Sequence, residues 1–373
     1  MTATDTATDT ATDTATDTAT DTATDTATDA ATDTAAAAVA AQATLHHQWL
    51  LGLQLMVATR EGPEATGEWM FRLFRRQHHA KFLSSFGKLG LEGLPHAVAC
   101  ARYHVLSNGV GGVRVEYMEE GPRKAWVRFR YPRWMYDGPT ICGVPVEASR
   151  GFLRGWYAQN GVSLGNPRLG FVCVSEDMTG QFGLCGYFRE ADRDLAEDER
   201  LVFAPDERPP EFDPAAQPEP PAEDWPQARL DKAARNYAME YCRNGVAELA
   251  GVLGRDRARE LAGLSARLTG LQHYPRMAEA VGGVDGGPAE AAGFLAAMFE
   301  GMGDETALEV SGSQAVIRQS GLRIARGLEG AARDDLLAAW TELWRGAVAS
   351  HRAFMSVEVA PEGDGLAWTV SRA

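Results

Sequence analysis

The same order of helices and hairpins occurs twice along this 373-residue chain, and this duplication limits the folds open to it. In each half, apolar residues recur first at helical spacing and then in alternation, which is typical of strands. The first half predicts helices over 45–60, 63–86 and 95–109, a hairpin over 113–118 and 125–131, a helix over 146–159, and a hairpin over 170–175 and 184–190. The second half predicts the same elements over 227–253, 255–269, 288–302, 307–310, 315–318, 334–349, 354–359 and 366–371.

Short segments of the two halves also match. Residues 152–156 match 336–340, and residues 125–128 match 315–318. Because the identity is low, the order of elements supports the duplication more strongly than the matched letters do. Two hairpins per copy predict an α+β fold of two tandem helices–hairpin–helix–hairpin modules, each with an antiparallel sheet covered by helices on one face. We expect the two copies to pack as a pseudo-dimer.

Shifts in composition divide the chain into four parts. Residues 2–34 repeat Thr-Ala-Thr-Asp and contain no large apolar residue, so residues 1–44 are predicted to be a disordered tail. Residues 205–226 are rich in Pro, Glu and Asp, which predicts an extended linker. The first module therefore spans 45–204, and the second, degenerate module spans 227–373.

The formal net charge of -15 argues against nucleic-acid partners, because phosphate binding requires concentrated Lys and Arg. It argues equally against an anionic membrane surface, and the longest apolar runs, such as 49–58, are shorter than a spanning helix requires. The N-terminal sequence does not resemble a secretory signal, and the five cysteines show no disulfide spacing, which indicates a cytoplasmic protein with free thiols. We expect a small-molecule ligand and a homodimer, the commonest assembly of such proteins.

The third helix carries a polar stripe of His96, Cys100 and His104, spaced by four residues. Side chains at this spacing share one helix face, so they can meet a common partner. Two imidazoles and a thiolate can bind zinc or iron. Cys100 and His104 can also form an activated nucleophile–base pair. The alternative is a buried, inert cysteine, because free cysteine usually behaves as a small apolar residue.

The loop after the first hairpin predicts a carboxylate-binding wall. Arg130 and Arg133 offer bidentate donors, and Trp134 and Tyr136 offer stacking surfaces. The corresponding segment of the second copy, 321–330, lacks these aromatic residues, which places the candidate site in the first copy. The alternative is that the aromatic side chains plug the end of the sheet.

Cys142 is the best single candidate for a nucleophile. It precedes a helix that opens at Pro145. The positive end of a helix dipole lowers the pKa of a nearby thiol and favours the reactive thiolate.

Three short segments carry a resemblance to a known family; they are Tyr131-Pro132, Asn166-Pro167, and Gly183 to Phe188 in the last strand of the first copy. They resemble the L-2-amino-thiazoline-4-carboxylic acid hydrolase family over about 113–190, and more faintly over 307–372. The resemblance implies an α+β fold, hydrolysis at a thiol site, and a substrate-binding place for Asn166. Two of that family's three cysteine positions hold other residues here, and only Cys185 fits.

Together these features predict an enzyme that acts on a small carboxylated molecule. The reaction would be hydrolytic or lyase-like, with a thiolate or a Cys/His-bound metal in the first copy. The alternative is a non-catalytic small-molecule-binding or sensor protein that uses the same pocket. A thiol with a lowered pKa, or a bound metal, would favour the enzyme.

Overall fold

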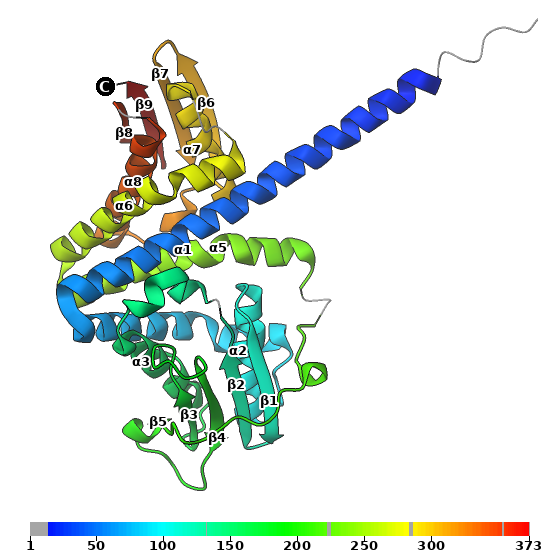
Figure 1. Cartoon of the computed structure of the whole chain (residues 1–373), viewed down its shortest axis with the longest axis vertical. Coiled ribbons are helices and arrows are strands. Elements are labelled where there is room, and N and C mark those ends of the chain that lie inside the picture. The colour runs from blue at the N-terminus through cyan, green and yellow to red at the C-terminus, as the bar shows by residue number, and fades with distance from the viewer. Residues whose placement is uncertain (1–13, 132, 222–224, 283–285, 353, 373) are drawn as a thin grey trace, which may run out of the picture.

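The computed structural model describes residues 14–131, 133–221, 225–282, 286–352 and 354–372, with side chains from residue 34 onward except at residues 110, 134, 227 and 228. It confirms an α+β fold with two sheets, each beside its own helices (Figure 1). The first copy contains α1 (Thr14–Lys81), α2 (His96–Val110), β1 (Val115–Gly121), β2 (Lys124–Phe129), α3 (Val146–Gly155), α4 (Asn160–Ser163), β3 (Leu169–Ser175), β4 (Cys185–Glu190) and β5 (Leu201–Phe203). The second contains α5 (Gln227–Leu253), α6 (Arg255–Val281), α7 (Pro288–Met302), β6 (Glu305–Ser311), β7 (Gln314–Ser320), α8 (Gly330–His351), β8 (Met355–Glu362) and β9 (Gly365–Arg372).

The two sheets share one strand order. The first sheet runs β1-β2-β4-β3-β5 and the second runs β6-β7-β9-β8. In both, the second strands of the two hairpins lie side by side in antiparallel pairing. Only β5 adds to this pattern, as a three-residue strand parallel to β3 that is too short to show a periodicity in the sequence.

Two glycines mark the duplication in the backbone itself. Gly62 interrupts α1 with φ 89° and ψ 175°, and Gly254 separates α5 from α6 with φ 81° and ψ 156°. Only glycine adopts this conformation at low cost, because it has no Cβ. Gly254 follows Gly62 by 192 residues, and Pro288 at the start of α7 follows His96 at the start of α2 by the same 192. The two copies therefore align residue by residue through their first three helices.

The first helix of each copy packs against the other copy. In α1, the segment before Gly62 passes beside α5, α6 and α7, and the segment after it lies in the first copy (Figure 1). Trp49 Nε1 donates to the carbonyl oxygen of Ala262 in α6 over 3.1 Å, and Trp69 Nε1 donates to that of Gly245 in α5 over 2.7 Å. One continuous apolar core therefore joins the two copies.

The tail is shorter than predicted. Residues 1–13 lie outside the described residues, and helical backbone begins at Thr14 and extends away from the body (Figure 1). Ala38 and Ala41 are buried, so the boundary at residue 44 is wrong. The reason is the alanine-rich run 35–41, which approaches α7 closely. Alanine has the highest helix propensity of all residue types, so this run continues the helix.

The described part of the linker covers an exposed sheet edge. The side-chain amide of Gln217 donates to the carbonyl oxygen of Tyr117 over 2.9 Å and accepts from its N–H over 2.8 Å. Tyr117 lies in β1, the edge strand of the sheet. Without Gln217, its backbone N–H and C=O would be left unpaired at that edge.

His46 makes the fold sensitive to acid. Its Nδ1 donates to the carbonyl oxygen of Gln42 over 2.7 Å, and its Nε2 accepts from Trp340 Nε1 over 3.1 Å. Burial lowers the pKa of His46 to about 4, and the bond to Gln42 offsets this only in part. A protonated ring would also place two donors against each other at Nε2.

We therefore expect the free energy of unfolding to fall as the pH drops. The pKa of His46 is lower in the folded than in the unfolded chain. The contribution of the neutral ring to the free energy of unfolding is therefore complete above about pH 6.5 and is lost as the pH falls toward 4. The loss is on the order of 3 kcal/mol for this group. Denaturant titrations between pH 7.5 and 4.5 measure it. His46→Gln should flatten the dependence, and His79→Gln should flatten it much less, because His79 is exposed.

Candidate functional site

The arginines of the predicted wall already bind carboxylates of the protein. Arg133 is 3% exposed, and its Nη1 lies 2.6 Å from Asp177 Oδ1. Burial alone would lower the pKa of Arg133, but Asp177 outweighs burial and raises it. Arg130 Nη1 lies 2.5 Å from Glu116 Oε1. The structure thus gives both guanidinium groups carboxylate partners within the protein.

The aromatic part of the wall packs inward. Tyr136 belongs to a short 3-10 turn, Trp134–Tyr136, and is buried with its ring 5.3 Å from the Arg133 guanidinium carbon. This arrangement matches the alternative of an aromatic plug at the sheet end. Pro132 and the side chain of Trp134 lie outside the described residues.

The residues of the stripe on α2 have separate partners. Among the residues that the structure describes, no group of three or more His, Cys, Asp or Glu could hold a metal ion. His96 Nδ1 lies 3.1 Å from Asn166 Nδ2, at the far end of the helix from His104. Asn166 also accepts from the backbone N–H of Arg168, so it has a local structural role.

Cys100 and His104 instead belong to a buried polar cluster. Asn160 Nδ2 lies 3.3 Å from His104 Nε2 and also hydrogen-bonds the Cys100 thiol. Burial raises the pKa of Cys100, and burial followed by the charge of His78 lowers that of His104. Both groups are therefore neutral near pH 7. A neutral, fully buried thiol is a poor nucleophile.

Cys142 and Cys185 lie apart from this cluster. Cys142 ends a 3-10 turn, Gly138–Cys142, and is exposed. Cys185, which fits the family pattern, is buried on the outer face of the sheet beside Trp126. The structure therefore brings no two of the candidate thiols together.

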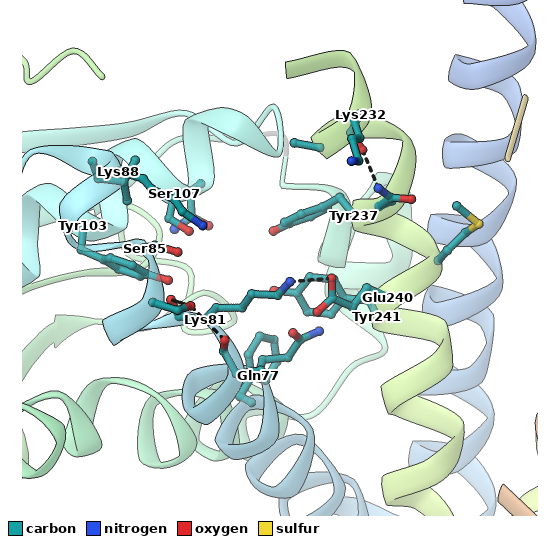
Figure 2. A pocket seen from close by; sticks show the side chains of 18 of the residues that line it. Gln77, Lys81, Ser85, Lys88, Tyr103, Ser107, Lys232, Tyr237, Glu240 and Tyr241 are labelled. Carbon is teal, nitrogen blue, oxygen red and sulfur yellow. Dashed lines mark hydrogen bonds and ion pairs between the residues drawn. The ribbon is translucent and has the colours of Figure 1, made fainter. Parts of the chain in front are cut away.

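A cavity of about 770 Å³ lies between the two copies. Its walls are the end of α1, α2 and the turn before it on one side, and α5 and the turn Arg323–Ala325 on the other. Figure 2 shows Ser85, Tyr103 and Ser107 facing Tyr237 and Tyr241 across the opening. Lys81 reaches across it to Glu240, with the Nζ–Oε2 distance 3.0 Å. We call this cavity the intercopy cleft.

The intercopy cleft concentrates positive charge in an acidic protein. Its described lining contains one acidic residue, Glu240, and seven basic ones: Lys81, Lys88, Arg229, Lys232, Arg243, Arg323 and Arg326. Burial lowers the pKa of Arg243; Glu240 opposes this, and Arg326 and Arg76 lower the pKa further. Like charges crowd there, so a bound anion would be stabilised.

Aromatic side chains form the floor of the cleft. Phe74, Phe152 and Trp156 line it, and Tyr241 lies 5.8 Å from Phe74 between ring centroids. His104, from the predicted stripe, also lines it and stacks on Tyr157 at 4.0 Å. Of the predicted site residues, His104 is the one that reaches this cavity.

The second copy fills the corresponding space. Ser107 is the twelfth residue of α2, and the twelfth residue of α7 is Phe299. Phe299 is fully buried against Trp344 and Trp368, with ring centroids 5.1 and 5.0 Å away. Aligning the third helices of the two copies would have shown this exchange of Phe for Ser. The basic residues gave no local signal, because they come from separate segments.

No protein-family model matches the chain, and no curated protein shows significant similarity to it. The resemblance to the thiazoline carboxylic acid hydrolase family therefore stays a prediction. None of the described helices is both long enough and apolar enough to cross a membrane.

Proposed function

We propose that this protein binds small organic anions that carry a flat apolar group, and that the intercopy cleft is the binding site. The observation that carries the proposal is the excess of seven basic over one acidic residue around an aromatic floor. Clefts of this size with convergent polar groups are typical small-molecule sites. Aromatic carboxylates fit this lining, since the ring meets the floor and the carboxylate meets the cations.

Three of the cations support recognition of an anion from outside the protein. Within the described part of the chain, Lys88, Lys232 and Arg326 form no ion pair. Their charges are thus not neutralised by neighbouring carboxylates, and a cleft with low-polarity walls strengthens their combined field.

The geometry favours binding over catalysis. Cys142 lies outside the cleft, and Cys100 lies behind its floor as a buried thiol with a raised pKa. A thiolate hydrolase would need the opposite arrangement, with an exposed thiol of lowered pKa beside the substrate. We therefore favour a binding or sensor protein.

Titration with 2-naphthoate, followed by calorimetry, tests the proposal. We expect binding, and we expect Arg326→Gln to weaken it roughly fivefold, because one partly screened charge contributes about 1 kcal/mol. Arg60→Gln is the matched control, since it removes the same charge at an exposed position outside the cleft. Equal binding of the neutral 2-naphthamide would contradict recognition of the anion.

The same titration includes a steric variant. Ser107→Phe gives the first copy the residue that fills the second, so binding should be lost while the melting temperature is kept, because Ser107 is only partly buried and faces open space. Ser107→Ala adds no volume and should bind normally. Unchanged binding by Ser107→Phe would place the ligand elsewhere.

A further inference from the structure

Two tryptophans at matched positions differ in their hydrogen bonding. Trp156 comes ten residues after the first residue of α3, and Trp340 comes ten residues after the first residue of α8. Trp340 Nε1 donates to His46 Nε2 over 3.1 Å. Trp156 is 8% exposed and lines the intercopy cleft, and its Nε1 has no acceptor among the described residues.

The register of the duplication explains the difference. His46 lies 16 residues before Gly62, and the residue 16 before Gly254 is Ala238. Alanine has no side-chain acceptor. Trp340 of the second copy therefore receives an acceptor from α1 of the first copy, whereas the matched position in α5 of the second copy offers Trp156 none.

A second donor lines the same cavity. Gln77 is 3% exposed, and its Nε2 also has no partner among the described residues. Figure 2 places Gln77 below Lys81 in the cleft wall. A buried N–H without an acceptor is unfavourable, so two such donors in one cavity indicate that an acceptor is supplied from outside the chain.

We infer that the ligand of the intercopy cleft is a heteroaromatic acid whose ring acceptor receives the Trp156 indole N–H, the role that the His46 imidazole has beside Trp340. The inference rests on the proposed function, which supplies the anion, and adds the acceptor. The carboxylate then lies toward the basic wall, and Gln77 donates to either acceptor group. Selectivity among flat organic acids therefore depends on Trp156 Nε1.

Two probes of nearly equal shape test this inference. Quinoline-6-carboxylate has a ring nitrogen that accepts a hydrogen bond, and 2-naphthoate has carbon in its place. We expect the wild-type protein to bind the quinoline roughly tenfold more tightly, the effect of one well-made buried hydrogen bond. In Trp156→Phe, which keeps an aromatic ring but removes the donor, the preference should disappear. Trp340→Phe is the matched control and should keep it.

Nuclear magnetic resonance of the indole N–H groups tests the same inference on the wild-type protein and does not depend on the folding of a variant. The Trp156 resonance of the wild-type protein should move downfield with quinoline-6-carboxylate and much less with 2-naphthoate, and the Trp340 resonance should stay in place.

The outcomes separate the inference from the proposed function. Equal affinity of the wild-type protein for both probes would overturn the inference and leave anion binding intact. An equal loss of affinity for both probes in Trp156→Phe would also overturn it, since the Trp156 ring would then contribute to binding by packing alone. If neither probe binds, the proposed function fails, and the inference fails with it.

Discussion

Asp177→Ala is expected to lower the free energy of unfolding by about 3 to 5 kcal/mol, because it leaves Arg133 charged and unpaired inside the protein. The Asp177 side chain is fully buried; Oδ1 accepts from Arg133 Nη1 over 2.6 Å, and Oδ2 accepts from the Ser149 hydroxyl over 2.8 Å. The Arg133 guanidinium also lies 4.4 Å from the ring centroid of Phe129, and its side chain is only 4% exposed, so water cannot take the place of the lost carboxylate. Denaturant titration measures the loss.

An exposed ion pair is the matched control for this variant. Arg72 and Glu68 pair over 2.8 Å with both side chains at least 40% exposed, so Glu68→Ala should cost less than about 1 kcal/mol. Replacing both buried partners, as Arg133→Met with Asp177→Leu, should restore much of the stability, because no buried charge then remains. A loss below about 1 kcal/mol in Asp177→Ala would show that water reaches Arg133.

Gly270→Ala should destabilise the second copy by about 3 kcal/mol, because α6 and α8 cross too closely for a methyl group. A Cβ at Gly270 would lie 1.9 Å from the carbonyl oxygen of Leu343 and 2.9 Å from the backbone nitrogen of Ala347. Both atoms belong to the helix backbone, so relief requires the two helices to separate.

Gly293→Ala should have the opposite effect. Gly293 lies inside α7, and a Cβ there would meet nothing within 4 Å. Alanine is the better helix former, so this variant should gain about 0.5 to 1 kcal/mol. The melting temperatures of the two variants should therefore move in opposite directions. A shift of the same sign and size in both would mean that α6 and α8 do not depend on this close crossing.

Gly270 also explains one boundary that the sequence misplaced. The predicted helix ends at residue 269, where glycine usually signals a stop, but α6 continues to Val281. The glycine is kept within the helix because it allows α8 to pack against it. The same residue type ends a helix at Gly62, where φ is positive. Local sequence cannot distinguish these two uses, since the difference lies in the neighbouring helix.

The candidate site was predicted less well than the fold. The sequence analysis placed the candidate site in the first copy, and His104, one of the residues it singled out, lines the intercopy cleft. It did not identify the basic wall, because residues such as Lys88, Lys232 and Arg326 are distant along the chain and line one cavity only when α5 packs across the first copy.

The sequence by itself determined the elements, their order and their duplication, because periodicity and turn residues act between near neighbours. It therefore predicted both hairpins of each copy. The tertiary structure alone decided which charges pair and where space remains: Arg133 meets Asp177, Trp340 meets His46, and Trp156 is left facing a cleft. These outcomes depend on the packing of helices far apart in the chain, and a local pattern carries no information about that packing.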